Sequence, residues 1–173
     1  VAVVGDEILS GLQERLAQLV DTELLYQRGR PPHAKYIFKH ALVQDAAYAS
    51  LLKSTRQQYH QQVAQMLEAR FPATIETEPE LVAHHYTEAG CSAQAVGYWQ
   101  QAGQRALQRS ANVEAIAHLR QGIALLITLP DSPARGQAEL TLQTTLGPAL
   151  MATGGYAAPE VAATYHRARE LCD

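Results

Sequence analysis

The chain has 173 residues, of which 47% are apolar and 18% are charged, and its formal net charge is −3. This composition is typical of one folded domain or two small ones, and the charge gives no overall attraction to nucleic acid or to an anionic membrane. Two distant cysteines without a CxxC pair argue against a disulfide framework or a cysteine zinc site and favour a reducing cytoplasm, and no apolar run reaches the roughly 18 residues that span a bilayer.

In chain order, the strand signals lie in the first part of the sequence. A helix is expected to begin at Asp6, which can cap it. Residues 22–27 and 35–39 favour strands, and the turn between them contains a glycine and two prolines, which regular structure does not tolerate. The sequence therefore predicts a β-hairpin over residues 22–39. Helix, strand, turn and strand is the order of the second half of a winged-helix module, so we expect a small module of that kind, whether complete or not.

The hydrophobic period changes at His40. Before this residue apolar side chains alternate as in a strand, whereas Val43, Ala47 and Leu51 recur every fourth residue, as on one face of a helix. The first N–H groups of a helix lack internal partners and carry the positive end of its dipole, so a histidine at this joint can help them to hold an anion such as phosphate. The alternative is a histidine that only caps the helix or packs beside the hairpin.

A further helix is expected over residues 54–70, and Pro72 ends it. Its expected apolar face consists of Tyr59, Val63, Met66 and Leu67. The polar stretch 73–80 follows and has the composition of a linker. We therefore predict two parts, a winged-helix-like module in residues 1–71 and a helical part in residues 79–173.

From Pro79 onward every segment has helical periodicity. A weak motif of a small, a large and a small residue recurs, in which the small residues let helices approach and the large one fills the groove between them. The copies are Ala95-Trp99-Ala102, Ala115-Leu119-Gly122 and Val161-Tyr165-Ala168. The fold class is thus expected to be mainly α, with stacked helical hairpins similar to tetratricopeptide repeats but without their regular spacing of about 34 residues. Trp99 should be largely buried between helices.

Residues 36–60, YIFKHALVQDAAYASLLKSTRQQYH, followed by ELVAHHYTEAG and ANVEAIAHL, resemble a specific bacterial arrangement. It is the segment after the ATPase domain in multidomain signalling ATPases of the STAND group, some associated with an adenylate or guanylate cyclase domain and others typified by the maltose activator. The resemblance covers residues 22–173 and is most specific in residues 36–60. It implies a non-enzymatic, cytoplasmic regulatory segment, cut from a longer protein, whose partners are an upstream ATPase domain and a protein or small inducer bound by the helical part.

In that class, a histidine in a methionine-histidine-aspartate motif of the winged-helix domain contacts the β-phosphate of bound ADP in the resting state. Lys39, His40 and Ala41 occupy these places here, so the histidine matches while the methionine and aspartate do not. The resemblance implies that His40 senses the phosphate of ADP held by the upstream ATPase domain. No cofactor is expected in the chain itself, and ADP or ATP is expected in the parent protein.

Basic residues gather on the predicted hairpin. They are Arg28, Arg30, Lys35 and Lys39, with His33 and His40 beside them. One interpretation is a wing that contacts the DNA backbone, as in a winged-helix transcriptional regulator. The helix before a wing usually reads the bases, however, and here it carries acidic residues that repel phosphates, namely Asp6, Glu7, Glu14 and Asp21. A solvated hairpin, or a surface that docks on an acidic partner domain, is the favoured interpretation.

No catalytic or metal motif is evident. His84 and His85 are adjacent and would point about 100° apart on a helix, which makes a poor ligand pair, and His85 continues an apolar face with Val82 and Ala89. Neither a phosphate loop nor a nucleophile-elbow motif occurs. The leading hypothesis is a regulatory and interaction segment without enzymatic activity. A DNA-binding regulator and a structural spacer are the alternatives.

Overall fold

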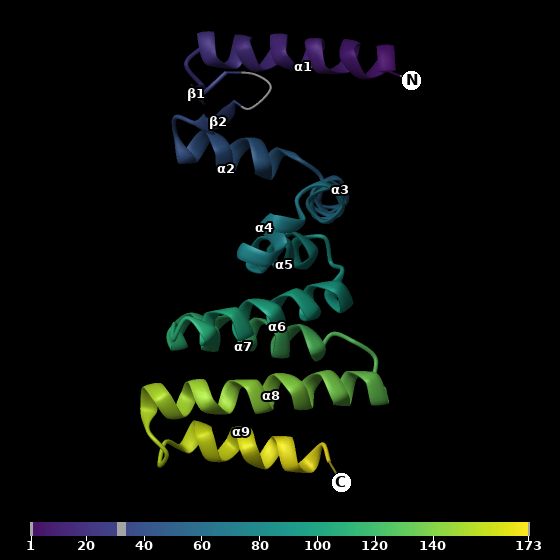
Figure 1. Ribbon diagram of the computed structural model, residues 1–173. Coiled ribbons are helices and arrows are strands. Elements are labelled where there is room, and N and C mark those ends of the chain that lie inside the picture. Colours follow the sequence, from purple (N-terminus) through teal and green to yellow (C-terminus); the bar gives the residue numbers. More distant parts are fainter. Residues whose placement is uncertain (1, 31–33, 173) are drawn as a thin grey trace. The chain divides into compact units, whose positions relative to one another are not determined.

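The computed structural model describes residues 2–30 and 34–172, and Figure 1 traces the chain. The described residues form helices and one two-stranded antiparallel sheet, so the predicted mainly α class with a single β-hairpin is confirmed. The chain separates into two compact units, Val1–Leu52 and Lys53–Asp173. Among the described helices, none is both long and apolar enough to cross a membrane.

The first unit holds the hairpin between two helices in sequence. Its elements are α1 (Ala2–Asp21), β1 (Leu25–Arg28), β2 (Lys35–Phe38) and α2 (Ala41–Ser50). The strands pair in a register that sets Arg28 opposite Lys35. Because α1 begins at Ala2, Asp6 lies inside the helix and does not cap it, contrary to expectation. Residues 31–33 of the predicted turn lie outside the described residues.

The first unit has very little core. Leu25 is its single buried side chain within residues 11–30 and 34–52. Many large apolar side chains stay exposed, including Leu12, Leu24, Tyr26, Ile37, Leu42 and Leu52. On α2, Val43 is half-buried, and the rest of the predicted apolar face is exposed. The hydrophobic period therefore predicted the helix correctly but not the burial of its apolar face.

The second unit consists of helices that pack in chain order, apart from the short α4, which lies beside α3 and α5 (Figure 1). They are α3 (Lys53–Arg70), α4 (Pro72–Thr77), α5 (Pro79–Glu88), α6 (Ser92–Gln108), α7 (Asn112–Leu126), α8 (Pro133–Gly154) and α9 (Pro159–Glu170). Proline begins four of them, where its missing N–H has no intrahelical role. Gly90, with a φ of 76°, follows the end of α5. The predicted start at Pro79 and stop at Gly90 are thus confirmed.

The division between the units differs from the predicted one. We expected a linker over residues 73–80, whereas α4 occupies most of this stretch and α5 begins at Pro79. We assigned helix α3 to the winged-helix-like module in residues 1–71, but it packs on α5 and belongs to the second unit. The polar composition of the stretch was misleading because Pro72 and Pro79 each start a helix and Thr77 Oγ1 donates to the Ala73 carbonyl at 2.9 Å.

A carboxylate joins α3 to α5 and α6. Glu68 accepts hydrogen bonds from the hydroxyls of Tyr86 and Tyr98, each at 2.6 Å, and the two rings stack with centroids 5.9 Å apart. Burial and the bonds to Glu68 raise the pKa of both tyrosines, that of Tyr98 to about 12. The predicted apolar face of α3 is wrong in part, because Tyr59 and Met66 are exposed. Helix α3 is held at this point by a polar side chain that the hydrophobic period does not mark.

Glycines bring the later helices close together. A Cβ atom placed on Gly103 of α6 would lie 2.5 Å from Cγ of Leu119 on α7, so the leucine fills a notch that only glycine leaves open. Gly147 of α8 has the same relation to Tyr165 of α9, at 2.5 Å, whereas a Cβ on Gly122 of α7 would lie 3.2 Å from Cδ1 of Leu142 on α8, which is a tight contact. Each glycine therefore acts as the contact point for a large side chain of the next helix.

The core of the second unit is aliphatic. Its largest buried cluster consists of Val96, Leu119, Leu126, Leu142, Leu146, Leu150 and Val161. Trp99 packs against a second buried cluster, formed by Ala64, Val82, Tyr86 and Ala95, and is partly buried. Its Nε1 donates to Thr87 Oγ1 at 3.0 Å, and its ring stacks on that of His118 with centroids 5.4 Å apart. The indole therefore keeps one polar edge at the α5 surface.

Candidate functional site

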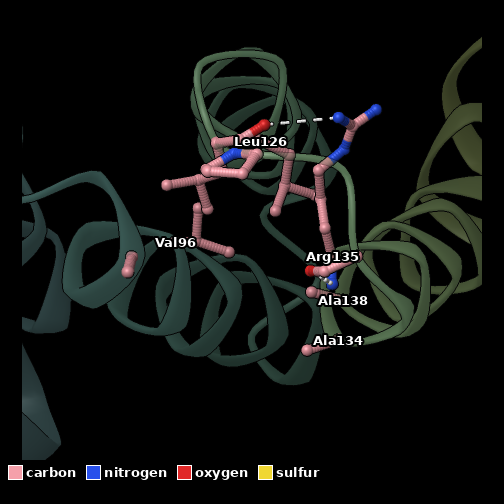
Figure 2. Close-up of a pocket in the computed structure, with 9 residues that line it drawn as sticks. Val96, Leu126, Ala134, Arg135 and Ala138 are labelled. Carbon is pink, nitrogen blue, oxygen red and sulfur yellow. Dashed lines mark hydrogen bonds between the residues drawn. The ribbon is translucent and has the colours of Figure 1, made fainter.

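A cavity of about 380 Å³ opens between α6, α7 and α8 (Figure 2). Its lining is mainly apolar and includes Val96, Leu126, Leu129, Pro130, Ala134 and Ala138. Val96 and Leu126 belong to the buried core, whereas Pro130 and Ala134 are exposed. The cavity is therefore an opening through which solvent reaches the side of the aliphatic core.

The connection between α7 and α8 creates this opening. Pro130 follows the end of α7, and Pro133 is the first residue of α8. Ser132 caps α8, since its Oγ accepts from the Arg135 backbone N–H at 3.2 Å. Two prolines so close together prevent either helix from continuing across the gap. The last side chains of α7 and the first of α8 consequently form walls on either side of the cavity.

Arg135 supplies the charge at the cavity. Figure 2 shows its side chain reaching from α8 to the end of α7, where Nη1 donates to the Leu129 carbonyl at 3.3 Å. The guanidinium also lies 3.7 Å from Oδ1 of Asp131, whose side chain is 95% exposed, so this ion pair is weak. A guanidinium has more N–H donors than these two contacts use. Arg135 can therefore donate to a carbonyl or carboxylate placed at the cavity.

The lining fits a small amphipathic molecule. Ligand sites in proteins are mostly apolar concavities with a few polar groups that fix the orientation, and the volume here falls within their usual range. An aliphatic or aromatic body would lie against Val96 and Leu126, and a carboxylate or carbonyl would lie near Arg135.

His40 lies at the joint where the sequence placed it. It is the N-cap residue of α2, with extended backbone angles (φ −130°, ψ 125°), and its side chain makes no capping hydrogen bond. The imidazole is exposed, while the backbone carbonyl accepts from the N–H groups of Val43 and Gln44. The side chain does not cap the helix, and its role toward ADP stays a prediction.

The basic residues of the hairpin differ in their surroundings, and their role in an interaction stays a prediction. Three of them are exposed: Arg28, Arg30 and Lys35. Lys39 instead forms an ion pair of 3.4 Å with Glu23 and lies 4.9 Å from the centre of the Tyr26 ring. Its charge is thus partly neutralised by a residue that is distant in sequence and adjacent in the folded hairpin. His33, the remaining member of the predicted group, is not among the described residues.

A third histidine joins His84 and His85. His60 of α3 brings its Nδ1 to 2.8 Å from that of His85, and its ring centroid lies 5.9 Å from that of His84. Burial lowers the pKa of His60 and of His85, and Glu88 opposes this shift in both. Within residues 2–30 and 34–172, no group of three or more His, Cys, Asp or Glu side chains is arranged to hold a metal ion. The histidines therefore form a contact between helices.

Sequence reasoning did not find the cavity. Val96 and Leu126 have the spacing of core residues, and core positions on one helix give no sign of an opening between three helices. The one available signal was the Pro130–Pro133 stretch, because a connection with two prolines cannot extend either helix over the core. Arg135 carried no signal, since an arginine in the first turn of a helix is ordinary.

Comparison with known proteins finds a similar bacterial protein but no matching family. No family model matches the chain, and no solved structure matches it. An uncharacterized protein from Rhizobium meliloti (strain 1021) is 26% identical over 170 residues, which cover 98% of this chain and 16% of that protein. The chain therefore corresponds to a small part of the length of this relative, and the similarity runs through both units.

Proposed function

We propose that the chain is a non-catalytic regulatory and interaction segment of a larger cytoplasmic signalling protein. In this proposal the second unit binds a small amphipathic inducer. The cavity between α6, α7 and α8 is the observation that carries the proposal, since it combines an apolar base with the cation of Arg135. The aliphatic core cluster forms the base of the cavity, so a ligand bound there would alter the packing of the three helices.

The packing of successive helices supports the receptor role. Helices α5 to α9 each pack on the next one, and a glycine notch brings α6 to α9 close together. We propose that these helices form a tetratricopeptide-like stack whose repeats differ in length. In such stacks each repeat contacts only its neighbours, so a ligand between α6, α7 and α8 changes the spacing of adjacent repeats.

The first unit, in this proposal, transmits the nucleotide state of an ATPase domain. Its exposed apolar side chains are suited to docking on another domain, because a unit with one buried side chain among its described residues gains stability from such contacts. His40 is exposed at the start of α2, where the helix dipole favours an anion. The much greater length of the Rhizobium meliloti relative agrees with a segment that works within a larger protein.

Titration with octanoate tests the receptor role. Octanoate has an aliphatic body and a carboxylate, and we expect it to shift the amide NMR signals of Val96, Leu126 and Ala138 in the chain. Octanol should bind more weakly, because it offers no negative charge to Arg135. Arg135→Gln should remove the difference between the two probes. Absence of octanoate shifts at these residues would contradict the proposal, and salt-dependent shifts of Arg28 and Lys35 on addition of duplex DNA would favour the DNA-binding alternative.

A further inference from the structure

A second, smaller site lies at Arg105 on α6. The Nε atom of this arginine is buried and has no hydrogen-bond partner among the residues that the structure describes. Nor does any described carboxylate form an ion pair with its guanidinium, whereas the neighbouring Arg109 on the surface pairs with Glu114 at 3.5 Å. A buried N–H of a charged group without an acceptor is destabilising, so an acceptor that reaches this atom would stabilise the protein.

The surroundings of Arg105 are polar. Arg105 lines a cavity of about 190 Å³ between α4, α5 and α6, with Ile75 and Pro79 as its apolar wall. Three glutamines of α6 also line it: Gln101, Gln104 and Gln108. Together with Arg105 they occupy one face of the helix, and each amide offers two further N–H donors. The cavity therefore presents N–H donors around one positive charge.

From this arrangement we propose that the cavity at Arg105 binds a carboxylate carried on a short aliphatic chain. A carboxylate accepts two parallel hydrogen bonds from the edge of a guanidinium, which would include the buried Nε–H. The volume is below the usual range for drug-sized ligands, which selects a small acid. Glu76 at the rim carries the opposite sign of charge to Arg105 and limits the affinity for an anion.

Succinate is the probe, and its neutral isostere succinamide is the control ligand. We expect succinate to shift the amide NMR signals around Arg105 at millimolar concentration, while succinamide gives no comparable shift. Arg105→Met should weaken succinate binding at least tenfold and leave the melting temperature unchanged or higher, because it removes the buried N–H. Arg109→Gln, at the C-cap residue of α6, should bind succinate like the wild type. Glu76→Gln should bind succinate several-fold more tightly.

A blocked peptide with a single glutamate distinguishes a free acid from an acidic side chain of a partner. Whichever of the two carboxylates binds more tightly, both results support the site. Equal binding of succinate by the wild type and Arg105→Met would overturn the proposal, as would equal binding of succinate and succinamide. A wild type whose signals do not respond to succinate would overturn it as well. Octanoate binding at the α6–α8 cavity is independent of these outcomes.

Discussion

The Nδ1 atoms of His60 and His85 lie 2.8 Å apart, so one imidazole donates a hydrogen bond to the other and joins α3 to α5. The bond is lost when both rings carry a proton at Nδ1. Burial lowers the pKa of both histidines from the ordinary value of 6.5, His84 lowers them further, and Glu88 opposes the shift. Below about pH 6.5 the unfolded chain therefore binds more protons than the folded chain. The free energy of unfolding consequently decreases as the pH is lowered.

We expect the free energy of unfolding to be at its full value above about pH 6.5 and to fall below it, by at most about 1.4 kcal/mol per pH unit for each histidine, until the folded-state pKa is reached. Urea unfolding at about pH 7.5 and at about pH 5.5 measures this difference. His60→Asn should reduce the pH dependence, whereas His40→Asn, at an exposed position without a capping hydrogen bond, should not. An unchanged pH dependence in His60→Asn would show that the histidine pair is not responsible.

Two glycines of α6 should respond in opposite ways to the same substitution. Gly97 is exposed and has open space where a Cβ would lie, so Gly97→Ala should raise the free energy of unfolding by roughly 0.5–1 kcal/mol through helix propensity. Gly103→Ala should lower it by about 1–3 kcal/mol, because the new methyl group meets Leu119, which is fully buried and cannot move aside. Chemical denaturation of both variants is the test. Equal effects would show that Leu119 does not need the space that Gly103 leaves open.

The Glu68 carboxylate should be essential only while its two tyrosine partners are present. Glu68→Leu leaves the hydroxyls of Tyr86 and Tyr98 without their acceptor and should lower the free energy of unfolding by about 1–3 kcal/mol. Adding Tyr86→Phe and Tyr98→Phe to this variant should restore most of the loss, since no polar group then lacks a partner. A triple variant no more stable than Glu68→Leu would mean that the hydrogen bonds are not the cause.

Much of the fold could be predicted because local signals and tertiary packing agree. Pro79 and Gly90 start and stop α5 through backbone chemistry that needs no neighbour, and the strand period before His40 changes to a helix period at the observed joint. The small residues of the repeated motif, such as Ala95 and Ala115, are buried as expected. Its large residues are not uniformly buried, because Tyr165 lies over Gly147 near the surface.

What the sequence could not predict depends on residues distant in the chain. Lys39 meets Glu23 only when the hairpin closes, and His60 meets His85 only when α3 packs on α5. The Nε atom of Arg105 lacks a hydrogen-bond partner because of the side chains packed around it, and residue spacing along α6 does not reveal these. The division between the units was misplaced for the same reason, since a polar composition does not show whether a segment will pack.

His40→Ala tests the proposed link between the first unit and nucleotide. In the longer signalling protein, loss of a hydrogen bond to a charged phosphate should weaken ADP binding roughly tenfold, with a smaller effect on ATP. Gln44→Ala, at another exposed position of α2, is the control and should leave both affinities unchanged. Calorimetric titration with each nucleotide gives the affinities. An equal loss for ADP and ATP, or no loss for either, would remove the sensor role of His40.

The most direct test of the receptor function is calorimetric titration of octanoate into variants that fill the α6–α8 cavity. Ala138→Phe places a ring within the cavity, and Ala134→Phe does so at its exposed rim, whereas Ala124→Phe adds the same ring at an exposed position of α7 outside it. We expect octanoate to bind the wild type and Ala124→Phe alike and to bind both cavity variants at least tenfold more weakly, with all proteins equally folded by circular dichroism. Unchanged octanoate affinity in Ala138→Phe and Ala134→Phe would contradict it.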